Sequence, residues 1–218
     1  MSNQIARIDL RLPERWCGWR PGDAPRVAQR LAAELTESPV AEARLRAALT
    51  AVDRAVVDLH TRHVRAAAWV PEPSGDVIGG LACELLAGAS GAPGAAQAHL
   101  GRVHRKIYRT RRTTSRTTYH AATLREVPAG EAVVTLRSHG VTRHEVIWTV
   151  FAPGAAEAVE LRFDTRDPDR YQELISHAET IAQALRVTVA RGRPGPVTPR
   201  GDVPGRPVAA AGSPRWRG

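Results

Sequence analysis

The runs 133–137, 145–151 and 159–164 constrain the fold more than any other feature. Successive side chains of a β-strand point to opposite faces, and the residue patterns of these runs predict three strands. In the second run Val146, Trp148 and Val150 face one way and Ile147, Thr149 and Phe151 the other. In the third run Val159, Leu161 and Phe163 alternate with Glu160, Arg162 and Asp164. Because only short turns join the runs, we expect them to pair as antiparallel neighbours.

Helical and strand periodicities before and after these runs complete the expected architecture. Apolar residues recur every three or four positions in 24–35, 39–62, 95–109 and 171–185, which predicts four helices. Further strands are predicted at 7–12, 64–70, 77–86 and 113–127. The order favours an α+β domain over residues 1–189, in which helices pack on an antiparallel sheet as an α/β sandwich.

The last 29 residues differ from the rest of the chain in composition. Pro, Gly and Arg make up 18 of the residues in 190–218, and no apolar periodicity continues there. Such a segment buries too little apolar surface to order itself, so we predict a disordered tail. Its residues Arg191, Gly192, Arg193 and Pro194 match the core of an AT-hook, in which an extended arginine pair enters the minor groove of A·T-rich DNA.

The positive charge of the chain is concentrated in two segments. The chain has 31 Lys and Arg against 22 Asp and Glu, for a formal charge of +9, and the tail accounts for +5 of it. A second segment holds seven basic residues and no acidic residue: Arg102, Arg105, Lys106, Arg109, Arg111, Arg112 and Arg116. The remaining residues sum to about −3, a distribution that favours an anionic partner. The alternative is that these cations pair with acids on neighbouring elements.

No motif for catalysis or metal binding stands out. The Trp16–Trp19 segment has a single cysteine where dithiol exchange needs two, and Cys17 and Cys83 are too few for a disulfide framework. Neither His60 with His63 nor His99 with His104 has an acidic residue at helical spacing to complete a site. No G-x-S-x-G elbow or Walker loop is present. We therefore predict no cofactor, no metal and no catalytic residue, and an enzyme ranks behind a binding protein.

Four segments carry a resemblance to a known family. They are Leu12–Trp16, Trp148–Gly154, Leu161–Thr165 and Ile181–Val187. In these the chain resembles the PsbP-like α/β-sandwich superfamily over residues 1–189, particularly small actinobacterial members that include mycobacterial LpqN-type lipoproteins. The resemblance implies an accessory or binding role rather than an enzyme. The lipoprotein members have a signal sequence and an acylated cysteine, neither of which this sequence predicts.

These observations predict a non-catalytic accessory module that acts through a protein partner. Arg7, Asp9 and Arg11 interrupt the apolar residues of 1–12, and no run reaches the about 18 apolar residues of a membrane span, so a cytoplasmic location is expected. The alternative function is nucleic-acid binding by residues 102–116, with Arg191 and Arg193 of the tail as further contacts. The partner's identity and the oligomeric state do not follow from the sequence.

Overall fold

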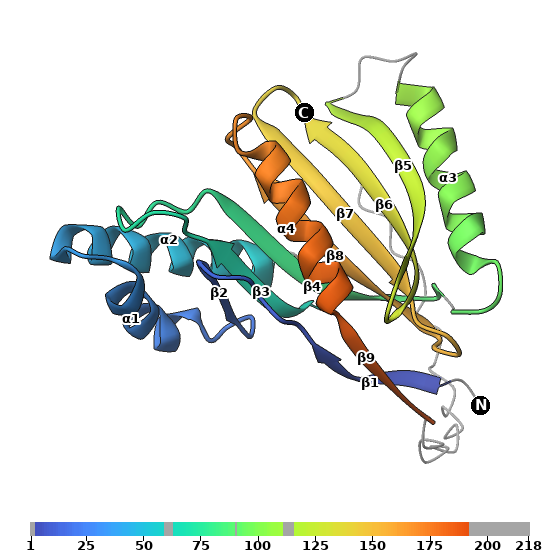
Figure 1. Cartoon of the computed structure of the whole chain (residues 1–218), viewed down its shortest axis with the longest axis horizontal. Helices are drawn as coiled ribbons and strands as arrows, with labels where there is room; N and C mark the ends of the chain where they lie inside the picture. The colour runs from blue at the N-terminus through green and yellow to red at the C-terminus, as the bar shows by residue number, and fades with distance from the viewer. Residues whose placement is uncertain (1–2, 59–62, 90, 111–115, 192–218) are drawn as a thin grey trace, which may run out of the picture.

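A computed structural model describes residues 3–58, 63–89, 91–110 and 116–191 of the chain (Figure 1). Its elements in chain order are β1 (Asn3–Asp9), β2 (Trp16–Trp19), α1 (Ala24–Leu35), α2 (Pro39–Asp58), β3 (His63–Trp69), β4 (Gly79–Ala87), α3 (Ala95–Thr110), β5 (Thr117–Val127), β6 (Gly130–His139), β7 (Arg143–Phe151), β8 (Glu157–Thr165), α4 (Tyr171–Ala184) and β9 (Arg186–Arg191). The four helices and the central strands confirm the α+β class.

Seven of the strands form one antiparallel sheet in the order β2-β3-β4-β8-β7-β6-β5. The alternating runs lie at its centre, where Val146 is opposite Phe163 and Trp148 is opposite Leu161. This register places the apolar residues of both strands on one face. The predicted antiparallel arrangement is therefore confirmed.

Helix α4 covers that apolar face (Figure 1). Leu174, Ala178, Ile181 and Leu185 are fully buried against the strands. At the side of α4, Trp16 and Trp69 stack with ring centroids 6.2 Å apart, and His177 lies edge-on to Trp69 at 4.8 Å. The indole N–H of Trp16 also donates to Nδ1 of His177 at 3.0 Å. Apolar burial and this ring cluster thus fix α4 on the sheet.

The other three helices lie on the opposite face, at the two ends of the sheet. Helices α1 and α2 pack on β2 and β3 through Leu31, Leu45 and Leu49. Helix α3 packs on β5, β6 and β7 through Ala96 and Leu100. The middle of this face, over β4, β8 and β7, lies between the two groups of helices (Figure 1).

The N-terminal region differs from the sequence prediction. The first strand is Asn3–Asp9 rather than 7–12, and it pairs with β9 in a separate two-stranded sheet. The segment Trp16–Trp19, for which no strand was predicted, is β2 at the edge of the main sheet. Both pairings join segments far apart in the chain, and local periodicity does not contain that information.

The predicted boundary of the tail also moves by two residues. Ala190 and Arg191 belong to β9, where they are opposite Gln4 and Asn3 of β1. The prediction that the tail begins at 190 was wrong because Val187 and Val189 continue a short strand. Residues 192–218 lie outside the described residues, and their predicted disorder stays a prediction.

The contact between α4 and the sheet yields a test of the core. Replacement Ile181→Ala removes a fully buried side chain and is expected to lower the free energy of unfolding by about 2–5 kcal/mol. Glu179→Ala, on the exposed side of the same helix, is expected to change it by less than about 0.5 kcal/mol. Urea unfolding followed by tryptophan fluorescence measures both. Equal losses in the two variants would contradict the placement of α4.

Candidate functional site

Helix α3 presents the predicted basic residues to solvent. Its apolar side packs on Val133, Phe151 and Ala158, so the opposite side is exposed. The four cations on that side are Arg102, Arg105, Lys106 and Arg109, all of them exposed. We call these four residues the α3 surface. Arg116 is also exposed, just before β5, whereas Arg111 and Arg112 lie outside the described residues.

The charges of the α3 surface are largely uncompensated. Among the described residues, Arg102, Arg105 and Lys106 form no ion pair; Arg102 instead lies 3.4 Å from Nδ1 of His99. Lys106 lies 5.7 Å from the centre of the Tyr119 ring, a cation–π contact. Burial, followed by the charges of Arg102 and Lys106, lowers the pKa of His99. The internal pairing with acids that the sequence left open is thus not seen for these three cations.

A groove runs along the surface where α3 meets the edge strand β5, and aromatic side chains line it. A cavity of about 360 Å³ is lined there by His104, Ile107, Tyr108, His120, Ala121 and Ala122. An adjoining cavity of about 400 Å³ is lined by His104, Arg105, Tyr108 and Arg109. Tyr108 is 58% exposed, and His104 makes a 3.2 Å contact with the carbonyl of Ala122. Cations and rings therefore line the same surface.

Of the two tail residues predicted to bind nucleic acid, the structure describes one. Arg191 ends β9, which lies apart from α3 (Figure 1). Arg193 lies outside the described residues.

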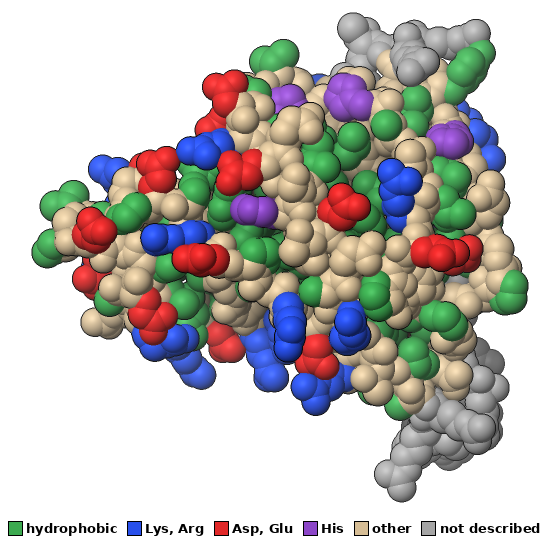
Figure 2. Space-filling model, viewed as in Figure 1, with side chains coloured by type: hydrophobic (Ala, Val, Ile, Leu, Met, Phe, Trp, Pro, Cys, Tyr) green, Lys and Arg blue, Asp and Glu red, His purple; other side chains and the backbone are tan. Residues whose placement is uncertain are grey.

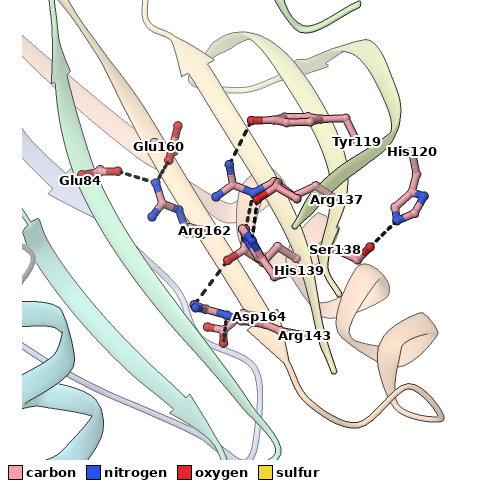
Figure 3. A network of polar contacts seen from close by, with 12 residues as sticks. Glu84, Tyr119, His120, Arg137, Ser138, His139, Arg143, Glu160, Arg162 and Asp164 are labelled. Atoms are coloured by element: carbon pink, nitrogen blue, oxygen red, sulfur yellow. Dashed lines mark hydrogen bonds and ion pairs between the residues drawn. The ribbon is translucent and has the colours of Figure 1, made fainter. Parts of the chain in front are cut away.

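The middle of the sheet carries a polar network that sequence reasoning missed (Figure 3). Strands β4, β8, β7, β6 and β5 each contribute side chains to the same face. Four carboxylates and three guanidinium groups meet there: Glu84, Glu145, Glu160, Asp164, Arg137, Arg143 and Arg162. The signal was present in the sequence as charged residues inside strongly apolar strands, but their partners lie on other strands.

Glu145 is the best-compensated carboxylate of this network. Its side chain is 2% exposed and pairs with Arg137, with His139 at 3.1 Å and with Arg143 at 3.4 Å. Burial by itself would raise the pKa of Glu145. The charge and hydrogen bond of Arg137, the hydrogen bond of His139 and the charge of Arg143 outweigh it, so the pKa lies below its usual value.

Glu160 has the opposite balance. It is opposite Glu84 on the neighbouring strand, and both carboxylates share Nη2 of Arg162, at 2.7 Å and 3.1 Å. Burial raises the pKa of Glu160, and the adjacent Glu84 adds to the rise despite the charge of Arg162. Burial likewise raises the pKa of Asp164, against the charge of Arg143. The network is thus mostly satisfied by its own members.

The thiols offer little reactivity. Cys17 and Cys83 are free and buried, and burial raises the pKa of Cys17 to about 11 and that of Cys83 to about 12. A thiol with so high a pKa is a poor nucleophile at neutral pH. Across the described ranges, no three His, Cys, Asp or Glu side chains are grouped to hold a metal ion. No helix in the described part of the chain is long and apolar enough to cross a membrane.

Comparison with known proteins shows a weak PsbP-like likeness. No family model matches the chain, and no curated protein matches it. The solution structure of cyanobacterial PsbP (CyanoP) from Synechocystis sp. PCC 6803 is 12% identical over 84% of this chain and 94% of that chain, with a TM-score of 0.43. The crystal structure of LpqN, involved in cell envelope biogenesis of Mycobacterium tuberculosis, is 15% identical over 83% of each chain, also with a TM-score of 0.43.

The network predicts opposite behaviour for two of its carboxylates. Glu145→Gln leaves Arg137 partly buried without its anion and is expected to lower the free energy of unfolding at pH 7 by about 3 kcal/mol. Glu160→Gln removes a carboxylate whose ionised form is disfavoured, and Arg162 keeps Glu84, so we expect a change below about 1 kcal/mol.

The pH dependence of the difference in unfolding free energy between wild type and Glu145→Gln provides the control. A carboxyl whose pKa is lowered by folding stabilises the fold above its unfolded pKa, and this contribution disappears as pH falls through the lowered pKa. The difference between wild type and Glu145→Gln is therefore expected to shrink in acid, in urea unfolding measured from pH 7 to pH 3. A difference that stays constant over this range would contradict the assigned ion pairs.

Proposed function

We propose that this protein is a non-catalytic binding module that acts through a protein partner in the cytoplasm, with the α3 surface as its main contact. The observation that carries the proposal is the set of exposed cations on α3, three of which form no ion pair among the described residues. A helix packed on a sheet holds them in a fixed arrangement. Such a surface favours an acidic partner by steering its approach and by pairing with its carboxylates.

A binding role is supported by the pairing of the carboxylates of the sheet network and by the burial of the two thiols. The carboxylates of the sheet network are bound to arginines of the same sheet, and the two thiols are buried. Groups held in this way are poorly placed to attack or protonate a substrate. The cytoplasmic location remains part of the proposal, and two free cysteines agree with a reducing compartment.

Charge reversal on α3 tests the proposal. The variant R102E/R105E/K106E is expected to capture at least about tenfold less partner from extracts of the native host than wild type, because three attractive contacts become repulsive. The matched control R26E/R46E/R54E changes the charge equally on the exposed sides of α1 and α2. Affinity capture with quantitative mass spectrometry measures both. Equal capture by wild type and the α3 variant would contradict the proposal.

Nucleic-acid binding is the second candidate function, and the exposed ring of Tyr108 beside Arg105 favours it. Aromatic rings next to cations bind single strands by stacking bases while the cations contact phosphates. With four phosphate contacts, the logarithm of the affinity is expected to fall with the logarithm of salt with a slope of about −3 to −4.

The two functions are separated by titrating a 20-nucleotide single strand and a duplex at several salt concentrations, followed by fluorescence anisotropy. Under the second candidate, Tyr108→Ala weakens single-strand binding about tenfold, and Tyr119→Ala, a half-buried ring on β5, weakens it less. Binding that is absent at low salt, or insensitive to salt, rules out the nucleic-acid function and leaves the protein partner.

A further inference from the structure

A second basic region forms only in the folded chain. Five arginines from distant parts of the sequence meet where residues 5–12 lie beside β3 and the end of α4: Arg7, Arg11, Arg20, Arg65 and Arg186. Figure 2 shows several basic side chains, with acidic ones between them, along the lower edge of the molecule, over β1, β2 and the end of α4. No two of these arginines except Arg7 and Arg11 are close in sequence, so no charge run marks the region.

Three cavities adjoin in this region, and Arg65 lines all of them. One of about 420 Å³ extends along Ile5, Ile8, Val64 and Leu85, and one of about 300 Å³ along Leu10, Leu12 and Leu81. The third, of about 590 Å³, is lined by Arg11 and Arg186 as well as by Ile8 and Leu10. We call these three cavities together the Arg65 groove. Arg65 thus lies where the three cavities meet. Their linings combine aliphatic side chains with the cations Arg7, Arg11, Arg20 and Arg186, and Asp9 lines two of the cavities.

The groove contains more positive charge than the protein neutralises. Arg7 pairs with Asp9 at 2.9 Å. Among the described residues, the other four arginines form no ion pair: Arg11, Arg20, Arg65 and Arg186. Arg65 donates from Nη1 to the carbonyl of Val64 at 2.8 Å, and Arg186 donates to the carbonyls of Gln183 and Leu185. Guanidinium groups left with only carbonyl partners are well suited to bind an added carboxylate.

We propose that the Arg65 groove binds an acidic peptide segment of a protein partner. One carboxylate side chain pairs with Arg65, its apolar neighbours contact the aliphatic side chains that line the groove, and further acids reach Arg20 and Arg186. This is recognition of an acidic motif by an arginine cluster, with pockets for the side chains between the acids.

The position of the charge favours a peptide over other anions. A fatty acid carries a single carboxylate, whereas the cavities that Arg65 lines also contain Arg11, Arg20 and Arg186, with aliphatic side chains between these cations. An inorganic anion would leave those cavities without a partner. Residues 192–218 of this chain carry five arginines and one acid, so their charge opposes binding here. An acidic residue between two apolar residues matches the groove in both charge and shape.

The proposal rests on the proposed function only in taking the partner to be a protein. The two sites lie on different elements, so their failures are separable. Arg65→Met removes the central charge of the groove and keeps much of the side-chain volume. The α3 variant R102E/R105E/K106E leaves the groove unchanged.

The test is fluorescence polarisation with a labelled ten-residue peptide whose central six residues alternate Glu and Leu. We expect Arg65→Met to weaken its affinity about tenfold and Arg20→Met about fivefold. Arg125→Met removes an equal charge on β5, at the far edge of the sheet, and is expected to change the affinity less than twofold. Retained binding by the α3 variant would support the groove even if capture of a partner by α3 fails.

Specific results would overturn the proposal. The first is that wild type, Arg65→Met and Arg20→Met bind the peptide with equal affinity. The second is that a peptide with Ser in place of Leu binds wild type as tightly as the original peptide. The third is that the α3 variant alone loses binding. Displacement of the peptide by dodecanoate at similar concentration would assign the groove to a fatty acid instead. Thermal unfolding of each variant identifies a folding defect; if Arg65→Met is unfolded, Arg20→Met at the exposed rim decides the outcome.

Discussion

The apolar contact between α4 and one face of the seven-stranded sheet is the constraint on which the other features of the structure depend. Burial of an apolar side chain is worth about 1.5–3 kcal/mol, and α4 contributes several that are completely enclosed, among them Leu174 and Ile181. The stacked rings of Trp16 and Trp69 extend this contact to β2 and β3. Because α4 occupies this face, the remaining helices pack on the other one, and residues 5–12 lie beside the end of α4.

The opposite face follows a different principle. In the part of the chain that the structure describes, helices cover this face at its two ends, and charged side chains occupy the strands between them. Burying these charges is tolerable because most of them are paired, with Glu145 bound by Arg137, His139 and Arg143. This pairing also has a consequence for the surface. Arginines and acids of the central strands neutralise one another, so the cations on α3 and around Arg65 remain available to an external anion.

Much of the architecture was predictable from local patterns. Period-two alternation identified the central strands, and three-to-four spacing identified all four helices, including the exposed cations of α3 on the side opposite Leu100. These features depend on residues close in sequence, and neighbouring side chains are enough to define them.

The sequence by itself therefore determined the four helices, the central strands, the fold class and the α3 surface, because each is a property of contiguous residues. The tertiary structure decided the pairing of β1 with β9, the edge position of β2, the network around Glu145 and the convergence of arginines on Arg65. Each of these joins residues separated by long stretches of chain, and periodicity contains no information on such contacts. The net charge of about −3 outside the two basic segments gave no indication of the Arg65 groove, because a net charge does not say which residues lie together in the folded chain.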